Sequence, residues 1–474
     1  MPAGSLTRVT RRRFLAGLAA ASVVVPRPGR AAPAAEPEMR LLRAATGEAA
    51  LRGPDRPATP IWGYDGVTPG PLLRVRRGGR LHVRLDNALP EATTIHWHGV
   101  RIANAMDGVP HLTQPPVAPG STFDYRFVAP DAGTFWYHPH LFASEQLERG
   151  LSGLLIVDET EPVDVDRDVA LLLDDWRLAA DGTVDVASFR SLHDAAHLGR
   201  IGSELTVNGA PAFTIPVRTN ERLRLRLVNG ANARIFDLRL DRHKAHVMAV
   251  DGQPAEPFVL RGGRLLLAPG NRVDLFVDAT LPAGSEAALF VDLPGGALPI
   301  ARLVYEAGDP ARPTPRPEPP ALPANPLPER MDFARALKRD IPMDGGAMRP
   351  PIPDASRPAA DRHFSGAPVW SLAGRASDGH SGPPLFSVKR GRTVMLAFQN
   401  RTAWPHAMHI HGHHFRLLDN LDDGWKPYWL DTLLIARGET GRIAFVADNP
   451  GKWMIHCHML EHQETGMAAW FEVT

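Results

Sequence analysis

The sequence predicts an all-β protein of about three domains, and three observations support this prediction. Short runs of Val, Leu, Ile and Phe alternate with Gly, Pro, Asn and Asp, which is typical of strands separated by turns. Proline (46 residues) and glycine (42 residues) are abundant in the 474-residue chain, whereas long stretches with helical periodicity are hard to find. A pattern of strand, turn and alternating strand also recurs three times. The alternative is a mixed fold whose helices are poorly visible in the sequence.

The recurring pattern predicts three similar β units. Each copy ends in an alternating strand that closes with an asparagine, at Asn87, Asn229 and Asn400. Units of roughly 120–150 residues are long enough to bury a sandwich core of their own. A very proline-rich stretch precedes the last unit and is expected to run extended over the surface. The expected segments are a first unit at 36–160, a second at 161–308, a linker at 309–330 and a third at 331–474.

The first 35 residues predict a targeting segment. The order Thr-Arg-Arg-Arg-Phe-Leu opens it, an apolar run from Phe14 to Val25 follows, and small residues at 31–35 offer cleavage sites. The apolar run is shorter than the ~20 residues that a membrane-spanning helix needs. The arginine pair followed by Phe-Leu resembles a twin-arginine signal, with a general secretory signal as the alternative. We therefore expect a periplasmic or secreted protein.

Composition narrows the range of partners. The formal net charge is +1, so the chain as a whole gives no reason to expect a nucleic acid or an acidic membrane surface as partner. No segment after the targeting signal has the length and hydrophobicity of a membrane span. Charge and hydrophobicity therefore predict neither a nucleic-acid partner nor a membrane span after the targeting segment.

Four His-x-His pairs indicate a metal cluster. Alternate residues of a strand point to the same face, so each pair can direct two imidazoles to one place. One such pair is weak evidence, but eight converging histidines exceed what core packing tolerates and require metal. The middle unit has no such pair, which places the chemistry where the first and third units meet. The pairs are His96 and His98, His138 and His140, His409 and His411, and His456 and His458.

The fourth pair encloses the single cysteine of the sequence, Cys457. Exported proteins usually use cysteines in disulfide pairs, so a lone one is either idle or chemically active. Alternation places Cys457 on the opposite strand face from its flanking histidines, so one strand can serve two metal sites. His406, Cys457 and His462, with Met467 further on, form the ligand set of a blue-copper electron-transfer site. Zinc is the rival metal, but a redox-inert ion would not need an eight-histidine cluster one residue away.

Together these motifs resemble the four copper motifs of the three-domain multicopper oxidases, a family that includes the laccases. The resemblance covers the chain from about residue 45 onward, including a middle domain without copper ligands. It implies three cupredoxin-like Greek-key β-sandwich domains, an oxidase activity and four bound copper ions. The segments that carry it are His96-Trp97-His98-Gly99, His138-Pro139-His140, His406-Ala407-Met408-His409-Ile410-His411-Gly412 and His456-Cys457-His458-Met459-Leu460-Glu461-His462, with Met467.

The resemblance also implies which residues hold each copper. A type 1 copper takes His406, Cys457 and His462, with Met467 in the axial position. A type 2 copper and a type 3 copper pair share the eight histidines of the four His-x-His pairs. The type 2 ligands are His96 and His409, and the type 3 ligands are His98, His138, His140, His411, His456 and His458.

The activity that follows from the resemblance is the reduction of dioxygen to water with electrons taken one at a time. A donor would deliver each electron through an exposed edge of His462, and the electron would pass through Cys457 to a neighbouring histidine. Both residues are therefore expected to take part in catalysis, together with an acid that supplies protons.

Asp107 is the candidate for this acid. Histidines that hold copper cannot donate protons, so a carboxyl group must feed the site. Asp107 resembles the family's acid beside the type 2 copper, and the alternative is an ordinary turn aspartate before a glycine. Several bacterial relatives place a second acid directly after the last type 1 histidine, where this chain has Gln463. Asp107 is therefore expected to carry more of the proton supply.

The sequence leaves the electron donor open between an organic reductant and Cu(I). Copper-efflux oxidases carry a methionine-rich insertion, and an Asp and a Met just before the first type 1 histidine, where this chain has Thr402 and Trp404. Methionines are sparse around the linker, which argues against a Cu(I) site. A phenol or aromatic amine is therefore favoured. Trp404, Trp425 and Trp429 are candidates to line its pocket, although tryptophans of sandwiches are more often core residues.

Other classes fit the motifs less well. A copper-free structural protein of the same fold would lack ligands, and every ligand type is present here. Copper nitrite reductases lack the three-domain layout and the His-Cys-His signature, and a copper carrier would not need the first two histidine pairs. Among the remaining histidines, His111 is expected in a loop near the mouth of the cluster.

Overall fold

The computed structural model describes residues 38–348, 368–418 and 425–474, and the predicted targeting segment lies outside these ranges. Strands dominate the described residues and build six sheets. The α-helices are short, the longest having six residues. None of them has the length and apolar character to cross a bilayer. The prediction of an all-β protein is confirmed.

The segment before residue 160 contributes two four-stranded sheets whose buried side chains share one hydrophobic cluster. In the order of pairing, the first sheet consists of β2 (Thr59–Tyr64), β1 (Met39–Ala49), β4 (Arg80–Asn87) and β6 (Thr122–Val128). The second sheet consists of β3 (Gly70–Arg76), β8 (Gly153–Asp158), β7 (Gly133–His138) and β5 (His96–His98).

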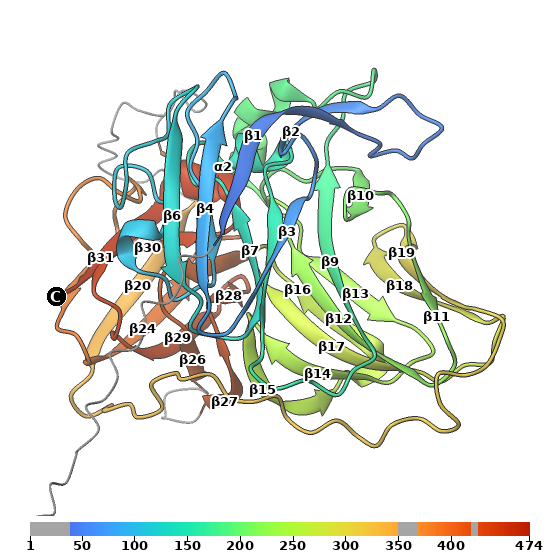
Figure 1. Cartoon of the computed structure of the whole chain (residues 1–474). Coiled ribbons are helices and arrows are strands. Elements are labelled where there is room, and N and C mark those ends of the chain that lie inside the picture. The colour runs from blue at the N-terminus through green and yellow to red at the C-terminus, as the bar shows by residue number, and fades with distance from the viewer. Residues whose placement is uncertain (1–37, 349–367, 419–424) are drawn as a thin grey trace, which may run out of the picture. The chain divides into compact units, whose positions relative to one another are not determined.

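The middle segment contributes a six-stranded and a five-stranded sheet around a second hydrophobic cluster. The six-stranded sheet consists of β10 (Glu204–Val207), β9 (Arg167–Trp176), β12 (Glu221–Asn229), β17 (Arg272–Ala279), β14 (Ala245–Val250) and β15 (Gln253–Val259). The five-stranded sheet consists of β11 (Phe213–Val217), β19 (Gly296–Tyr305), β18 (Glu286–Leu293), β13 (Phe236–Leu240) and β16 (Arg264–Leu267). Figure 1 shows these strands in green and yellow.

The last segment contributes the remaining two sheets, which carry two of the four histidine motifs. The first consists of β21 (Trp370–Leu372), β20 (Leu337–Gly345), β24 (Thr393–Asn400), β29 (Thr440–Val446), β26 (Phe415–Leu418) and β27 (Trp425–Leu430). The second consists of β22 (Ser377–Asp378), β31 (Met467–Val473), β30 (Gly451–Cys457), β25 (His406–Ile410) and β28 (Thr432–Ile435), with β23 (Ser387–Val388) also paired to β31.

The repeated asparagine closes the same corner in each unit. β4, β12 and β24 run parallel to β1, β9 and β20 respectively, and end at the buried residues Asn87, Asn229 and Asn400. The Asn87 amide donates to the carbonyls of Glu91 and Val117, while its oxygen accepts from a backbone N–H two residues on. The other two asparagines make the same kinds of bond. One short amide thus satisfies several buried backbone groups, which explains the residue type.

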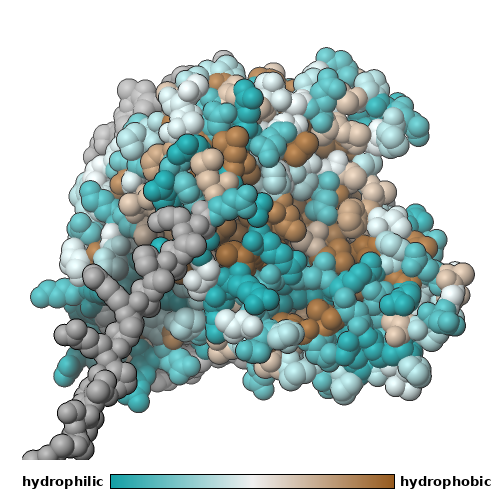
Figure 2. All heavy atoms as spheres, viewed as in Figure 1, coloured by the Kyte–Doolittle hydropathy of each residue, from teal (hydrophilic) through white to brown (hydrophobic). Residues whose placement is uncertain are grey.

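Short helices connect the sheets near the C-terminal motif. α4 packs against both α2 and α3, so segments of the first and middle units lie beside the end of the chain. Figure 2 shows one face of the molecule, on which hydrophobic residues are mixed with hydrophilic ones. The helices are α2 (Ala143–Glu148), α3 (Leu192–Ala196) and α4 (Leu460–Glu464), and the 3-10 turns are η1 (Asn104–Met106), η2 (Val186–Arg190) and η3 (Arg261–Gly263).

Candidate metal centre

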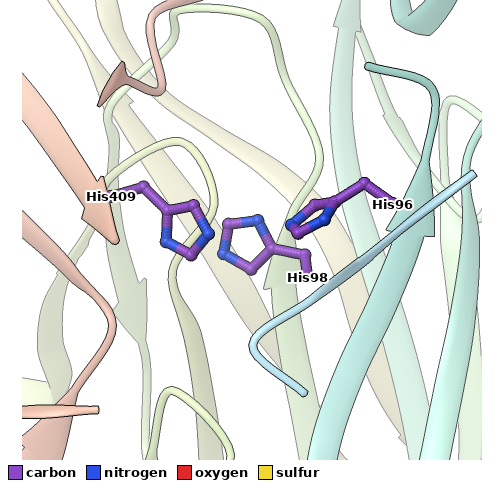
Figure 3. A group of neighbouring side chains, drawn as sticks. All are labelled: His96, His98 and His409. Atoms are coloured by element: carbon purple, nitrogen blue, oxygen red, sulfur yellow. The ribbon is translucent and has the colours of Figure 1, made fainter. Parts of the chain in front are cut away.

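The four His-x-His pairs gather where the first and third units meet. His96 and His98 form β5, which pairs with β7 so that His138 lies opposite His96. In the third unit β25 pairs with β30 and places His409 opposite His456. The two strand pairs bring all eight histidines together, and each is at most 5% exposed. Figure 3 shows His96 and His98 from the first unit beside His409 from the third.

Three groups of imidazoles hold ring nitrogens within 4.8 Å of one another. Each group draws histidines from both the first and the third unit, so neither unit forms the cluster alone. In one group the Nε2 atoms of His411 and His456 lie only 3.1 Å apart, a separation at which both cannot carry a proton. The groups are His98, His138 and His458; His140, His411 and His456; and His96, His98 and His409.

Backbone carbonyls fix the outer nitrogens of several of these rings. Nδ1 of His96 donates to the carbonyl of Asp107 (2.8 Å), and Nδ1 of His409 donates to the carbonyl of Asp431 (2.9 Å). A proton on Nδ1 leaves the lone pair of the neutral ring on Nε2, and this pattern is typical of metal-bound histidines. The other two bonds of this kind run from His138 to Pro139 and from His456 to Cys457.

The inner nitrogens are buried without hydrogen-bond partners, which tests whether a metal fits the site. Each such atom costs about 1–3 kcal/mol when left unpaired, so a group of them favours a bound cation. Burial lowers the pKa of six rings well below the usual value, and neighbouring imidazoles lower it further: His98, His138, His140, His411, His456 and His458. Neutral imidazoles suit copper. The unpaired atoms are Nε2 of His96, His138, His140 and His409, Nδ1 of His98, and both ring nitrogens of His458.

A second, smaller group surrounds the cysteine. The Sγ atom of Cys457 lies 3.6 Å from Nδ1 of His406 and 3.7 Å from Nδ1 of His462, and the two nitrogens are 3.1 Å apart. All three residues are fully buried. Met467 is also fully buried, at the first position of β31, and belongs to the same hydrophobic cluster as Cys457. Burial raises the pKa of the Cys457 thiol to about 12, so a thiolate at neutral pH needs a cation beside it.

The outer side of the His406 ring is held by a threonine. Thr402 Oγ1 lies 2.8 Å from Nε2 of His406, and Thr402 is itself fixed by the amide oxygen of Asn400. The indole of Trp370 packs against both histidine rings of this group, with ring centroids 5.0 Å from His406 and 4.4 Å from His462. In the sequence, Thr402 was notable only because it stands where copper-efflux oxidases carry a different residue. The threonine-to-histidine bond is a contact that the sequence did not reveal.

The expectation that His462 presents an exposed edge is wrong. The residue is 0% exposed, and its Nε2 donates to the carbonyl of His197 (2.8 Å). His197 follows α3 of the middle unit, and this helix is held in place because Trp370 Nε1 donates to the carbonyl of Ala195. A short segment far away in the sequence thus covers the imidazole. His197 itself is half-buried, so the residue that covers His462 is partly in contact with solvent.

Asp107 lies in direct contact with the histidine cluster. Its Oδ2 accepts from Nδ1 of His411 (2.9 Å), and its Oδ1 lies 3.3 Å from Nδ1 of His96 without making a hydrogen bond. The following Gly108 has a φ of +81°, and a Cβ there would lie 1.8 Å from the carbonyl oxygen of Ile95. The turn therefore needs glycine. Asp107 is thus both a turn aspartate before a glycine and a residue in contact with the histidine cluster.

A cavity of about 320 Å³ is lined by residues of the first and third units and includes His140 of the cluster. His111 and His140 both line it, which supports the expectation that His111 lies near the mouth of the cluster. Gln463 also lines the cavity, and its buried Oε1 has no hydrogen-bond partner. The neighbouring Glu464 lines it too, with its carboxylate held by the N–H and hydroxyl of Ser144.

Trp404 and Trp429, two of the three tryptophans proposed for a donor pocket, have different surroundings. Trp404 is half-buried, and its ring centroid lies 5.0 Å from that of His197. Trp429 is buried, and the guanidinium of Arg416 covers it at 4.3 Å from the ring centroid. The cavity beside Trp429 is lined by residues of the linker and of β15, and it does not include His462. The side chain of Trp425 lies outside the described residues.

Comparisons with known proteins agree with this geometry. Three family models described as multicopper oxidase match residues 47–162, 167–286 and 353–474. The multicopper oxidase MmcO of Mycobacterium tuberculosis is 30% identical over 434 residues, covering 85% of this chain and 81% of MmcO. Among solved structures, a multi-copper oxidase of Pseudomonas thermotolerans has a TM-score of 0.80 at 36% identity, covering 92% of this chain and 99% of its own.

A further solved structure is similar in both fold and extent. The bacterial laccase-like multi-copper oxidase CueO of Ochrobactrum sp. has a TM-score of 0.75 at 27% identity, covering 92% of this chain and 97% of its own. The structural relatives share the cupredoxin-like sandwich fold that the sequence motifs implied. The histidine groups and the cysteine site fit copper. From these matches and from the residues that converge at its core, the chain belongs to the multicopper oxidases.

Proposed function

We propose that this multicopper oxidase is a laccase-type enzyme that takes electrons from phenols or aromatic amines and reduces dioxygen to water. The observation that carries the proposal is the group of eight buried histidines, six of them with unpaired ring nitrogens, whose fourth pair encloses Cys457. The proposal includes four copper ions, one of type 1, one of type 2 and a type 3 pair, and a periplasmic or secreted location reached through the twin-arginine route. It also includes domains at 36–160, 161–308 and 331–474, with a linker at 309–330.

The proposed ligand assignment follows the grouping of the side chains. Type 1 copper is assigned to His406, Cys457 and His462, with Met467 axial. Two of the three-histidine groups contain only residues assigned to the type 3 pair. In the third group, the ring of His98 (type 3) stacks on the ring of His409 (type 2). The type 2 ligands are His96 and His409, and the type 3 ligands are His98, His138, His140, His411, His456 and His458.

When bound, the copper ions supply the one-electron steps and the reduction of dioxygen. The chain holds the two sites one residue apart on β30, because Cys457 is covalently joined to His456 and His458. It excludes water from His462, whose Nε2–H donates to the carbonyl of His197. This hydrogen bond joins the buried imidazole to the half-buried His197, where the proposal places the entry of electrons from a donor.

Asp107 is proposed to hold a proton for the cluster. Its Oδ2 faces Nδ1 of His411, and its Oδ1 is free of hydrogen bonds. The cavity lined by His140, His111 and Gln463 offers water and dioxygen a way to the same region. Gln463 has no acidic proton, whereas Asp107 is a carboxyl group of the first unit in direct contact with the histidines.

Oxidation of Cu(I) is the second candidate function. His193 and His197 lie one helical turn apart, and their rings are stacked with centroids 4.0 Å apart on the segment that covers His462. Imidazoles bind copper ions well, so this surface could offer ligands for a metal donor. One relative, 27% identical, is named a copper resistance protein A homolog of Pseudomonas syringae, which is consistent with such a role. The replacement of efflux-type ligands by Thr402 and Trp404 favours the organic donor.

Oxygen uptake with a phenol is expected to proceed without added copper once the protein is loaded with copper. The reason is that Thr402 and Trp404 stand where efflux-type oxidases place ligands for an additional copper. Oxygen uptake would be measured with a phenol, with an aromatic amine and with Cu(I). The Cu(I) solution is kept anaerobic until it is added to the oxygenated enzyme. His193→Ala serves as a control, because it removes an exposed imidazole and leaves the His197 carbonyl in place. An obligatory need for excess Cu(II) in phenol turnover would favour the second candidate.

Met467→Leu is expected to keep the blue colour and to raise the reduction potential of the type 1 copper. A thioether donates weakly in the axial position and slightly stabilises Cu(II), so its removal favours Cu(I). Redox titration of the blue absorption measures the change. Met454→Leu is the matched control, because Met454 is equally buried in the third unit but belongs to a different hydrophobic cluster. A potential that stays equal or falls would show that Met467 is not axial.

A further inference from the structure

One arginine of the middle unit contacts all three units. Arg272, at the start of β17, is fully buried, and its Nε donates to the carbonyl of Thr134 in the first unit (3.2 Å). Its two terminal nitrogens donate to both carboxylate oxygens of Asp431 in the third unit, at 2.8 and 2.6 Å. The remaining hydrogens go to the carbonyls of Gly270 and Asp251 in its own unit. All five N–H groups of this side chain thus have acceptors.

Asp431 in turn lies against two histidines of the cluster. Its Oδ1 is 3.4 Å from Nε2 of His98 and 3.5 Å from Nδ1 of His409, and its backbone carbonyl accepts from the same Nδ1 of His409. Thr432 adds a hydroxyl that donates to Asp431 Oδ1 (2.8 Å) and lies 3.0 Å from Nδ1 of His409. The rings of His98 and His409 are stacked, with centroids 3.9 Å apart. The arginine therefore reaches two candidate copper ligands through one carboxylate.

The charges in this buried network depend on Arg272. Asp431 receives two hydrogen bonds from Arg272, and its Oδ2 also lies 3.5 Å from Nε2 of His414. Burial and the neighbouring Asp431 raise the pKa of Asp251 to about 6. One guanidinium thus stands between two carboxylates, and its planar fork fixes which oxygen of Asp431 faces the histidines.

A second observation places the middle unit against the cluster. Gly270, two residues before Arg272, has a φ of +84°. A Cβ at this position would lie 2.9 Å from Cδ2 of His458 and 3.0 Å from Cε1 of His98. The turn of the middle unit therefore approaches the histidine rings so closely that it tolerates no side chain. The unit without copper ligands forms part of the wall of the cluster.

We propose that Arg272 is a positioning residue for the copper cluster, and first of all for the type 2 copper: by holding Asp431 it fixes the ring orientation and tautomer of His409, a type 2 ligand, and of the stacked His98, a type 3 ligand. The inference rests on the ligand assignment proposed above. It gives the middle unit a function in the copper cluster beyond that of a spacer between the two units that bear ligands. Outer-shell partners of this kind typically change metal affinity by about 10–100-fold.

Arg272→Lys tests the proposal because it keeps the positive charge but removes the planar fork. We expect the blue type 1 absorption to stay at the wild-type level, because Arg272 has no contact with the cysteine site. We expect the type 2 copper to bind about 10–100-fold more weakly, measured by electron paramagnetic resonance and copper analysis under competing chelator. Asp431→Asn, which keeps the size and removes the charge, should give the same change with Arg272 intact.

The matched control is Arg224→Lys. Arg224 is equally buried in the middle unit and pairs with Asp274 and Glu159, away from the histidines. Its variant should lower thermal stability and leave the type 2 signal unchanged. Two results with Arg272→Lys would overturn the proposal: an unchanged type 2 signal, or a parallel loss of type 1 and type 2 copper. If Arg272→Lys does not fold, the same two results are judged on Asp431→Asn. A wild-type protein with a blue band but no type 2 signal would instead overturn the ligand assignment itself.

Discussion

Cys457→Ser is expected to abolish the intense blue absorption and to reduce oxygen uptake with any donor to background. The colour arises from charge transfer between a thiolate and copper, and an alcohol cannot replace the thiolate. Because burial raises the pKa of the Cys457 thiol to about 12, the thiolate is present only with a cation beside it. Absorption spectra, copper analysis and oxygen uptake of the copper-loaded variant provide the measurements.

Wild-type protein stripped of copper and reloaded is the control for this variant, and it should regain both colour and turnover. The eight histidines lie outside the substituted site, so the variant should keep most of its copper and lose about one ion per chain. Two results would contradict the assignment: a serine variant that remains blue, or wild-type protein that contains zinc in place of copper.

Asp107→Asn is expected to keep the copper content and the blue colour and to lower turnover by about 10²–10⁴-fold, the loss typical of a missing general acid. Asparagine is nearly isosteric and its oxygen can still accept from Nδ1 of His411, so the ligand geometry should survive. It has no proton to release during dioxygen reduction. Stopped-flow reoxidation of the reduced enzyme across the pH range measures the step that consumes protons.

Asp131→Asn is the matched control for Asp107→Asn. Asp131 is an equally buried aspartate of the first unit that pairs with Arg101, and it has no contact with the histidine cluster. Its variant should reoxidise at the wild-type rate. If Asp107→Asn also reoxidises at that rate, the proton relay runs elsewhere. If it loses copper, the carboxylate serves to orient His96 and His411.

The sequence could predict most of the metal centre because each ligand belongs to a local pattern. Strand alternation alone directs the members of a His-x-His pair to one side, and the enclosed Cys457 to the other. The structure brings His406, Cys457 and His462 together and groups the eight histidines as that pattern requires. The repeated asparagines likewise predicted three units, since the same corner recurs at Asn87, Asn229 and Asn400.

The contacts around the ligands could not be predicted in the same way. Asp431 follows a strand in the third unit and has no local feature that distinguishes it from an ordinary turn acid. Its role depends on Arg272, which lies 159 residues earlier and reaches it only after three units have packed together. The burial of His462 was missed for the same reason, because α3 comes from the middle unit. Sequence patterns identify residues that act within one element, and contacts between units are outside their reach.

The atom that shields His462 from solvent belongs to the main chain. Every amino acid provides the same carbonyl at position 197, so no single substitution there uncovers the imidazole. The shield moves only with its segment, which Trp370 Nε1 holds through the carbonyl of Ala195 (2.6 Å) and the N–H of Ala347 holds through Ala196 (2.7 Å). Under the proposed function, access of a donor to His462 is therefore a property of the segment as a unit. It would change by insertion, deletion or exchange of residues 192–198, or by loss of the Trp370 side chain that holds the segment, rather than by substitution at position 197.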